Sequence, residues 1–266
     1  MKQGKILYRG ILLVSLFAFF FCVRYICKWH IENENIKRVS TEVAQESKEE
    51  NKGMEELINP PNDITDSYYK YIDYPLLTID FSKLYTINTD IKGYLKVGGT
   101  SIDFPVVQTT NNTFYLNHAI DKSINSAGSL FFDYRNYIDH LDKNTVIYGH
   151  GRLDKIMFGT LKNVLNNTWY KEEANRVIQF TTAHGKMLFQ IVSVYTIPEE
   201  TYYITTHFKD KEEYHQFLQK IIDRSIYKFY TTLNTKDKIL TLSTCKDGKG
   251  MRLVVHAKLI KKETIS

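Results

Sequence analysis

Cysteine is scarce in this 266-residue chain, and its scarcity excludes several kinds of site. Two of the three cysteines, Cys22 and Cys27, lie in an apolar N-terminal segment, so only Cys245 belongs to the remainder. One thiol excludes an internal disulfide and the usual structural zinc sites, which need several ligands at short spacing. Cys245 is therefore a buried inert thiol, an intermolecular bridge or a nucleophile.

A basic surplus is also missing from most of the chain. The formal net charge of +5 comes from 35 Lys and Arg against 30 Asp and Glu. Residues 1–30 hold five Lys or Arg and no acidic residue, which leaves 30 basic and 30 acidic residues in the rest. Nucleic-acid binding needs a positive surplus on the folded part, although a local patch would escape this count. We therefore expect no nucleic-acid partner.

The first 30 residues carry the long apolar run of the chain. Residues 10–23 alone are short against the roughly 20 residues of a membrane-spanning helix. Residues 6–26 suffice if Arg9 and Arg24 extend their charged ends to the two interfaces. No small-x-small cleavage site follows, and no later apolar span exists. We expect residues 1–30 to form a cytoplasmic tip and an uncleaved signal anchor, with the remainder on the extracellular face of the cell membrane.

Residues 31–62 differ from both of their neighbours in composition. They are rich in Glu, Lys, Asn and Ser, which predicts a polar stalk or an N-terminal helix, helical from about residue 41 to 57. The sequence Asn-Pro-Pro-Asn at residues 59–62 would end such a helix. Residues 63–266 have a globular composition and a comfortable length for one domain, in which we expect the chemistry to lie.

Strand-like runs dominate this domain, separated by Gly, Asn and Asp turns. Eight short strands suggest a closed barrel or a sandwich, so the expected fold class is mostly β with added helices. Two helical patterns, at residues 157–165 and 211–230, interrupt the strands, and the longer one presents six apolar residues, the last of them Ile226, on one face. The strand-like runs are 93–97, 104–108, 129–133, 145–148, 176–180, 187–195, 238–244 and 252–260.

Strand periodicity orients the side chains around the single domain cysteine. Cys245 ends one run and Arg252 begins the next after a short loop, so an antiparallel pair would bring the two face to face. A guanidinium there would stabilise a thiolate and donate to a developing oxyanion. His150, in the sequence Tyr-Gly-His-Gly, supplies the remaining group for acyl transfer through a thioester. His256 shares a face with Arg252 and is the runner-up base.

As a set, these residues resemble the catalytic residues of the sortases, membrane-anchored cysteine transpeptidases of Gram-positive bacteria. The resemblance is carried by Thr-Leu-Ser-Thr-Cys at 241–245, by Arg252 in Arg-Leu-Val-Val-His-Ala-Lys, and by Tyr-Gly-His150. Residues 93–108, the sequence Asn-Thr-Phe-Tyr-Leu at 112–116 and the helical pattern at 211–230 narrow it to class B. It implies an eight-stranded sortase-type β-barrel with N-terminal helices and a long helix between the sixth and seventh strands.

The resemblance also implies a mechanism and partners. Cys245 would attack the carbonyl of a threonine in a C-terminal sorting motif of a secreted protein and form a thioester. His150 would protonate the leaving amine and deprotonate the incoming one, while Arg252 would hold the substrate backbone and the oxyanion. A peptidoglycan precursor amine would accept the acyl group, and the N-terminal anchor would bind the cytoplasmic membrane. This acyl transfer needs no cofactor and no metal.

The resemblance says less about the substrate groove. For Leu116 and Ile204, packing in the hydrophobic core explains an apolar residue about as well as contact with a substrate does. The resemblance assigns substrate contacts to Ser243, Asn112, Leu116, Tyr203 and Ile204.

Two alternative functions stay open. One is a transpeptidase that links pilin subunits through lysine amines, and the other is a non-catalytic sortase-like module for surface interactions. A cysteine protease that uses water as acceptor is a variant of the wall-anchoring transpeptidase. The presence of Cys245, His150 and Arg252 together argues against the module, because a binding surface has no need of all three.

Overall fold

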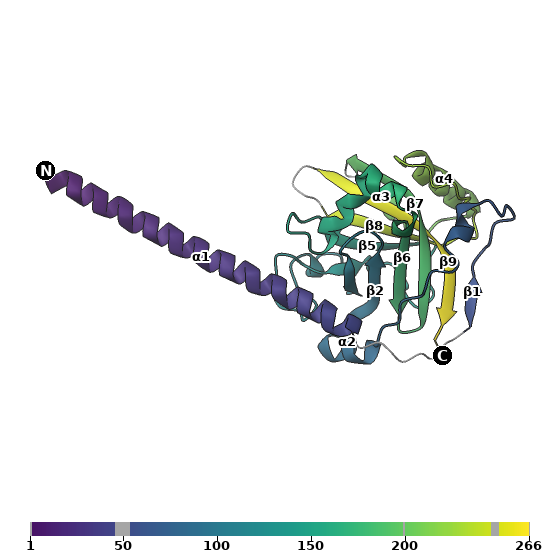
Figure 1. Ribbon diagram of the computed structural model, residues 1–266, viewed down its shortest axis with the longest axis horizontal. Helices are drawn as coiled ribbons and strands as arrows, with labels where there is room; N and C mark the ends of the chain where they lie inside the picture. Colours follow the sequence, from purple (N-terminus) through teal and green to yellow (C-terminus); the bar gives the residue numbers. More distant parts are fainter. Residues whose placement is uncertain (1, 46–53, 199, 246–249, 266) are drawn as a thin grey trace. The chain divides into compact units, whose positions relative to one another are not determined.

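The computed structural model describes the backbone of residues 2–45, 54–198, 200–245 and 250–265. The chain forms two compact units, residues 1–41 and 42–266. Helix α1 (Lys2–Gln45) runs through the first unit, and the second contains all the strands of the described part (Figure 1).

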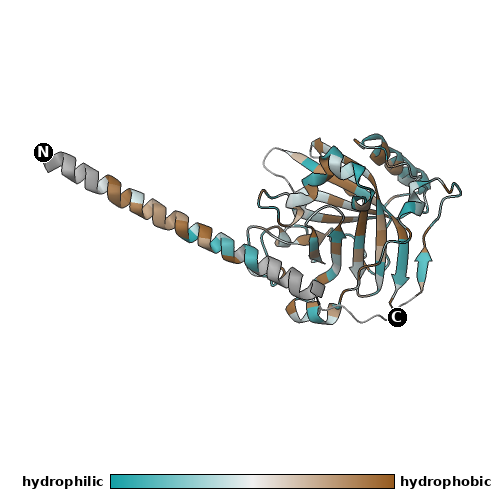
Figure 2. Ribbon diagram, in the orientation of Figure 1, coloured by the Kyte–Doolittle hydropathy of each residue, from teal (hydrophilic) through white to brown (hydrophobic). Residues whose placement is uncertain are grey.

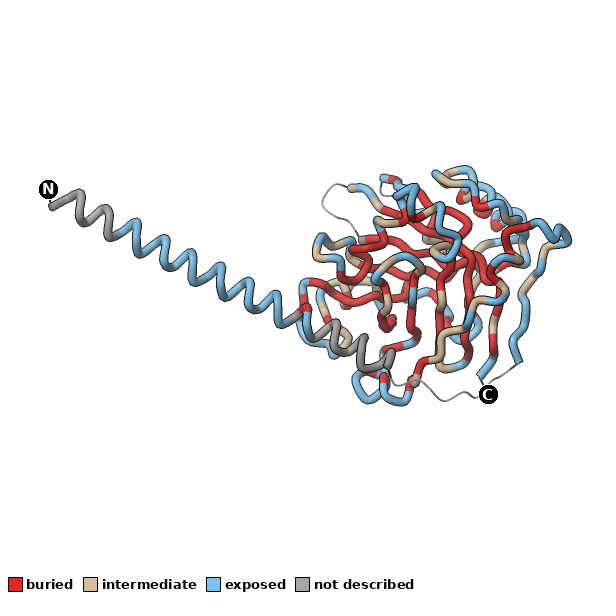
Figure 3. Tube along the Cα trace, in the orientation of Figure 1, coloured by how far each residue is buried: buried red, intermediate tan, exposed pale blue. Residues whose placement is uncertain are grey.

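Helix α1 contains an apolar span of 22 residues, Gly10–Ile31, with a mean hydropathy of 2.2. Figure 2 shows this span as the brown part of the long helix. Its large side chains, such as Phe17 and Phe20, are exposed. Figure 3 shows this part of the helix coloured as exposed. The length and composition suffice to cross a membrane, and a signal sequence shares them. The helix expected in residues 1–30 is present, whereas cleavage and orientation stay predictions.

The second unit is a closed barrel of eight strands. Going round the ring, the order is β9-β7-β6-β2-β3-β4-β5-β8, and β8 pairs with β9 to close it. Each barrel strand overlaps one of the eight strand-like runs, so the prediction of an eight-stranded barrel is confirmed. The strands are β2 (Ile91–Val97), β3 (Asp103–Val107), β4 (Leu130–Phe132), β5 (Asn144–His150), β6 (Val177–Thr182), β7 (Gly185–Pro198), β8 (Ile239–Cys245) and β9 (Met251–Thr264).

A further short strand, β1 (Glu55–Leu57), pairs antiparallel with the C-terminal half of β9. The helix expected from about residue 41 to 57 is therefore wrong at residues 55–57, and its part at residues 46–53 lies outside the described residues. The carboxylate of Glu55 lies 3.1 Å from Lys261 Nζ, and that of Glu56 lies 3.2 Å from Lys262 Nζ. The acidic residues that predicted a solvated helix thus pair with lysines on β9.

Short helices connect the strands and cover the barrel. The long helix α4 lies between the sixth and seventh barrel strands, as expected, but ends at Asp223. The Ile226 N–H instead donates to Val194 O of β7 at 2.8 Å, and the Ile226 side chain is 51% exposed. The α-helices of the barrel unit are α2 (Phe81–Ile87), α3 (Asn167–Lys171) and α4 (Lys211–Asp223), and its 3-10 helices are η1 (Ser67–Lys70), η2 (Phe114–Leu116), η3 (Phe158–Leu165), η4 (Glu173–Asn175) and η5 (Tyr202–Ile204).

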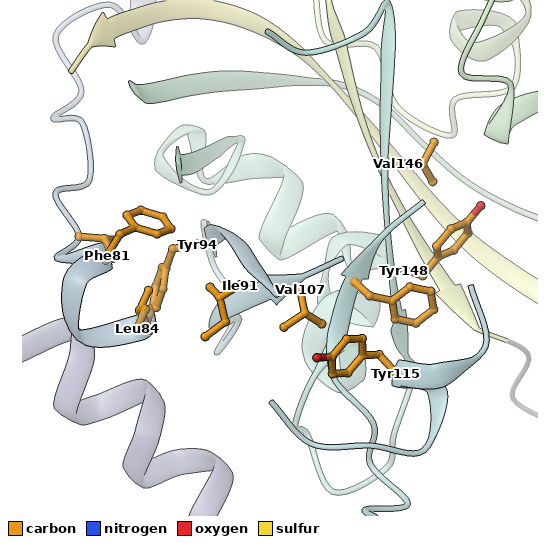
Figure 4. Close-up of a cluster of buried hydrophobic side chains, with 10 residues drawn as sticks. Phe81, Leu84, Ile91, Tyr94, Val107, Tyr115, Val146 and Tyr148 are labelled. Carbon is orange, nitrogen blue, oxygen red and sulfur yellow. The ribbon is translucent and has the colours of Figure 1, made fainter. Parts of the chain in front are cut away.

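Most large apolar side chains of the barrel unit are buried, and Figure 3 shows the strands as mostly buried. One core cluster extends from helix α2 across β2 and β3 to β5, so it links the helix that packs against the barrel to the strand that ends at His150 (Figure 4). Its labelled members are Phe81, Leu84, Ile91, Tyr94, Val107, Tyr115, Val146 and Tyr148. Each fully buried apolar side chain contributes about 1.5–3 kcal/mol relative to an exposed one.

The C-terminal half of β9 also carries buried charge. Lys258 Nζ lies 3.4 Å from the Asp237 carboxylate, and both side chains are fully buried. Lys258 Nζ also donates to Thr232 O at 3.0 Å, and Asn59 Nδ2 donates to Asp237 at 3.1 Å. This network joins β9 to the loop before β8 and to the segment that enters the barrel.

Candidate active site

Three neighbouring strands bring the predicted catalytic residues to one end of the barrel. Strands β5 and β8 run parallel, and their register places His150 beside Cys245. Strands β8 and β9 run antiparallel, as predicted, with Ser243 opposite Val254. Continued by two residues, this register places Cys245 opposite Arg252. The Cys245 side chain and residues 246–249 lie outside the described residues, whereas the Cys245 backbone ends β8.

The Arg252 side chain is fixed beside the end of β8. Its Nη1 donates to the carbonyl oxygen of Thr244 at 3.1 Å, one residue before Cys245. A guanidinium this close to the cysteine backbone brings positive charge to the place where a thiolate or an oxyanion would form.

The His150 ring is oriented by the backbone of η2. Its Nε2 lies 2.7 Å from the carbonyl oxygen of Leu116. Since a carbonyl oxygen only accepts, Nε2 carries a proton in this arrangement. The other ring nitrogen, Nδ1, is then the atom through which the neutral ring can exchange a proton.

A groove of about 440 Å³ lies at this end of the barrel. His150 and Arg252 line it, together with four of the five residues to which the family resemblance assigns substrate contacts. The complete lining is Asn112, Leu116, Phe131, Tyr148, His150, Glu200, Thr201, Tyr203, Ile204 and Arg252.

Ser243, the fifth predicted substrate contact, lies behind the groove. Its side chain is fully buried and its Oγ lies 3.2 Å from the Tyr203 hydroxyl. Tyr203 is part of the groove wall, so any influence of Ser243 on a substrate would act through Tyr203.

A buried carboxylate that the sequence reading missed holds the groove wall together. Asp133 is fully buried and accepts hydrogen bonds from Arg135 Nε at 2.8 Å, Tyr148 Oη at 2.8 Å and Asn112 Nδ2 at 3.1 Å. Burial alone would raise the pKa of Asp133, but the hydrogen bonds from Arg135 and Tyr148 outweigh it and the pKa is lowered. Arg135 Nη2 also donates to Ile204 O at 3.0 Å. Asp133 thus connects Asn112, Tyr148 and, through Arg135, Ile204, all of which line the groove.

Glu200 is the acidic residue among the groove-lining residues that the structure describes, and no motif marks it in the sequence. Its carboxylate pairs with Arg224 at 2.9 Å, directly after helix α4. Only the folded arrangement of α4 and the loop before η5 brings this pair to the groove. Tyr148, in contrast, could have been found from the sequence, because it belongs to the Tyr-Gly-His motif that contains His150.

His256, the runner-up base, packs against Phe217 of helix α4 and does not line the groove. Its Nδ1 is 2.8 Å from Thr241 Oγ1 and its Nε2 is 2.7 Å from Tyr195 Oη. Complete burial lowers its pKa to about 3, so the ring is neutral near pH 7. These contacts exclude His256 as the base of this site.

The described residues contain no group of three or more His, Cys, Asp or Glu side chains arranged to hold a metal ion. What the site offers is instead an arginine, a half-buried histidine and a cysteine-bearing strand end beside an open groove. This arrangement suits nucleophilic chemistry on an extended peptide.

Comparison with known proteins identifies the family. The sortase domain family matches residues 95–260. Sortase B of Staphylococcus aureus is 38% identical over 184 residues, which are 68% of this chain and 75% of that protein. A crystal structure of sortase B complexed with triglycine has a TM-score of 0.65 and 35% identity, covering 70% of this chain and 86% of that one. The Staphylococcus aureus sortase B–substrate complex has a TM-score of 0.64 and 37% identity, covering 68% and 84%. The chain therefore belongs to the sortase family of cysteine transpeptidases and, within it, resembles the sortase B members.

Proposed function

We propose that this protein cleaves a C-terminal sorting motif of secreted proteins after a threonine and transfers the acyl group to an amine of a peptidoglycan precursor. Cys245, His150 and Arg252 would be the catalytic residues. The observation that carries the proposal is the alignment of these three residues across β5, β8 and β9 beside one groove.

In the first half-reaction, the Cys245 thiolate attacks the threonine carbonyl and a carbon–sulfur bond forms. The peptide C–N bond breaks, and the departing amine takes a proton from His150. The Nδ1 atom is the suitable donor, because Nε2 is held by the Leu116 carbonyl. Protonation of the ring before this step leaves Nε2 and its hydrogen bond unchanged.

In the second half-reaction, an acceptor amine attacks the thioester carbonyl. A new C–N bond forms, the C–S bond breaks, and the proton lost by the amine returns to His150. Arg252 faces both steps from the same side, where its guanidinium can stabilise the oxyanion. The number of acyl bonds is conserved, so the transfer requires no external energy source.

Substrate binding is proposed for Asn112, Leu116, Tyr203 and Ile204, with Ser243 acting through Tyr203. Asn112 is fixed at both ends, since its Nδ2 donates to Asp133 and its Oδ1 accepts from Tyr134 N at 2.9 Å. A rigid amide of this kind can read the backbone of an extended peptide without a large cost in side-chain entropy. The solved sortase B–substrate complex supports such a groove by similarity.

The domain organisation is part of the proposal. Residues 1–30 would form the cytoplasmic tip and the single-pass anchor, residues 31–62 the stalk, and residues 63–266 the catalytic domain outside the membrane. The apolar span of α1 supports the anchor, and strand β1 within the stalk segment ties that segment to the barrel.

Intact-mass spectrometry of the full-length protein in detergent micelles tests this function. The protein is incubated with a panel of sorting-motif peptides, with and without an added amine, beside the Cys245→Ala and Arg252→Ala variants. We expect an acyl adduct that requires Cys245 and that amine releases faster than water does. A reactive thiol that forms no adduct with any peptide of the panel would contradict the proposal.

The choice of acceptor is tested separately. In a competition between a peptidoglycan stem-peptide amine and a lysine-bearing pilin-type peptide, we expect the thioester to react preferentially with the stem peptide. Preference for the lysine side chain would instead identify a pilin-polymerising enzyme.

A further inference from the structure

A second hollow, of about 220 Å³, lies beside the same strand end as the groove. The two share Arg252 and no other lining residue. Successive side chains of β8 point to opposite faces of the strand, so the two hollows lie on different sides of it. Ser243 contacts Tyr203 of the groove wall, whereas the next residue, Thr244, lines the second hollow. We call this second hollow the basic hollow.

Charge is the first distinguishing feature of the basic hollow. Its described lining contains the cations Arg152, Lys162 and Arg252 and no acidic residue. The Arg152 guanidinium is compensated by Asp154, whose Oδ2 accepts from Arg152 Nε at 2.9 Å. Lys162 is exposed, and its ammonium makes no hydrogen bond or ion pair with the residues that the structure describes. The hollow therefore has a positive potential that favours an anionic group.

Exposed apolar side chains are its second feature. Leu153 is 91% exposed, Met251 41% and Leu165 37%, and all three line the basic hollow. Single exposed apolar residues are ordinary, but three that line one hollow offer apolar surface to a bound ligand. The hollow thus offers apolar contact beside a cation.

Access to the reacting carbonyl gives these features a use. In the thioester, the acyl part of the sorting peptide stays bound to Cys245 and fills the groove. The incoming amine must therefore reach the thioester carbonyl from another direction. The basic hollow lies on the other face of β8 and reaches the same arginine. An ammonium ion would be repelled there, whereas nearby cations favour the neutral, nucleophilic form of an amine. An acceptor held in this hollow would therefore be anchored by a group other than its amine.

We propose that the basic hollow is the acyl-acceptor site and that it selects acceptors that carry a carboxylate as well as the attacking amine. The inference rests on the proposed function. The carboxylate binds at Lys162, the acceptor backbone lies along the apolar side chains, and the amine reaches round the end of β8. The amine nitrogen forms the new C–N bond, the C–S bond to Cys245 breaks, and His150 takes the released proton, so atoms and electrons balance.

Two acceptors that differ only in the carboxylate provide the test. The full-length enzyme in detergent micelles is converted to its thioester and challenged with triglycine or with triglycinamide. The ratio of their kcat/KM values is measured for the wild-type protein and for Lys162→Gln and Lys162→Glu. Lys171→Gln is the matched control, because Lys171 is exposed at the end of α3 and does not line the hollow.

We expect Lys162→Gln to lower the triglycine/triglycinamide ratio by about three- to fivefold, the size expected of one exposed charge pair. Lys162→Glu should lower it further, and Lys171→Gln should leave it unchanged. High salt should reduce the wild-type ratio towards that of Lys162→Gln, since the interaction is exposed to solvent. Comparing ratios removes the intrinsic difference in reactivity between the two amines.

A ratio that is the same in the wild-type and Lys162→Gln proteins would overturn the acceptor site. A protein that forms no thioester with any sorting peptide would overturn the proposed function, and this inference with it. A thioester that forms normally but reacts equally with both acceptors would overturn only the acceptor site. The rate of thioester formation, measured before the amine is added, separates these outcomes.

Discussion

The two halves of strand β9 use charge in opposite ways. In the C-terminal half, Lys258 and Lys261 are buried and paired with acidic residues of the loop before β8 and of β1. In the N-terminal half, Arg252 donates to a neutral carbonyl and lines two hollows that open to solvent. Buried pairs hold strands together because removing one partner is costly, whereas a charge beside an open hollow can act on a substrate. One strand therefore divides into a part that maintains the fold and a part that lines the proposed active site.

The largest effect is expected from breaking the buried pair in the C-terminal half. Lys258→Met leaves Asp237 without its cation in a fully buried position, so the free energy of unfolding should fall by about 3–5 kcal/mol. Denaturant unfolding followed by the fluorescence of Trp169, which is buried in the barrel unit, measures it. The double variant Lys258→Met/Asp237→Asn should recover part of the loss. A single variant as stable as the wild type would show that the pair does not hold the strand.

A variant in the N-terminal half of β9 should instead reduce activity more than stability. Arg252→Ala should lower kcat/KM for acyl transfer by about 10²- to 10³-fold, because a donor to the developing oxyanion is lost. Its free energy of unfolding should change much less than that of Lys258→Met. Arg252→Lys is the control, since it keeps the charge and loses the planar guanidinium. Full activity in Arg252→Ala would remove the contrast between the two halves.

His256 lies between the two halves and allows a pH test of stability. Its pKa is lowered from 6.5 to about 3 by burial, so below pH 6.5 the unfolded chain binds a proton that the folded chain does not. Stability should therefore fall with pH from about 6.5 towards 3, by about 2 kcal/mol at pH 5. Comparison of unfolding curves at pH 7 and pH 5 for the wild type and His256→Gln measures this contribution. An equal loss in both proteins would assign it to other groups.

The smallest effect is expected at the buried carboxylate behind the groove. Asp133→Asn weakens the hydrogen bonds that fix Asn112 and Arg135, so KM for the sorting peptide should rise about tenfold, with a smaller change in kcat. Tyr148→Phe, which removes one of the donors to Asp133, should show a weaker form of the same shift. Steady-state kinetics separates the two constants. A loss confined to kcat would place Asp133 in the chemistry and not in positioning.

Most of the barrel could be predicted because its strands are local in sequence. Runs of β-branched and aromatic residues between turn residues define all eight barrel strands, and a short loop is enough to predict the pairing of β8 with β9. Strand β1 was missed because two of its three residues are glutamates, whose partners on β9 lie some 200 residues away. The end of α4 was missed because the backbone of β7 captures Ile226.

The candidate site also contains features that local sequence predicts and features that depend on distant contacts. The opposition of Cys245 and Arg252 follows from strand periodicity and one short loop. The position of His150 beside Cys245 depends on the parallel pairing of β5 with β8, across 95 residues, which no local sequence pattern predicts. Asp133 and Glu200 have no sequence signal, because their roles arise from side chains that meet only in the folded barrel.

The parallel pairing of β5 with β8 has a consequence for how the enzyme matures. Strand β8 is inserted between β5 and β9, so the ring closes only when both β8 and β9 are in place. Cys245 and Arg252 both lie on these strands. Non-local pairing of this kind is slow to form, because a long loop must be ordered before its contacts are gained. A chain in which β8 and β9 have not yet paired would therefore hold His150 without Cys245 and Arg252 beside it, and the proposed catalytic residues would meet only after both strands have joined the ring.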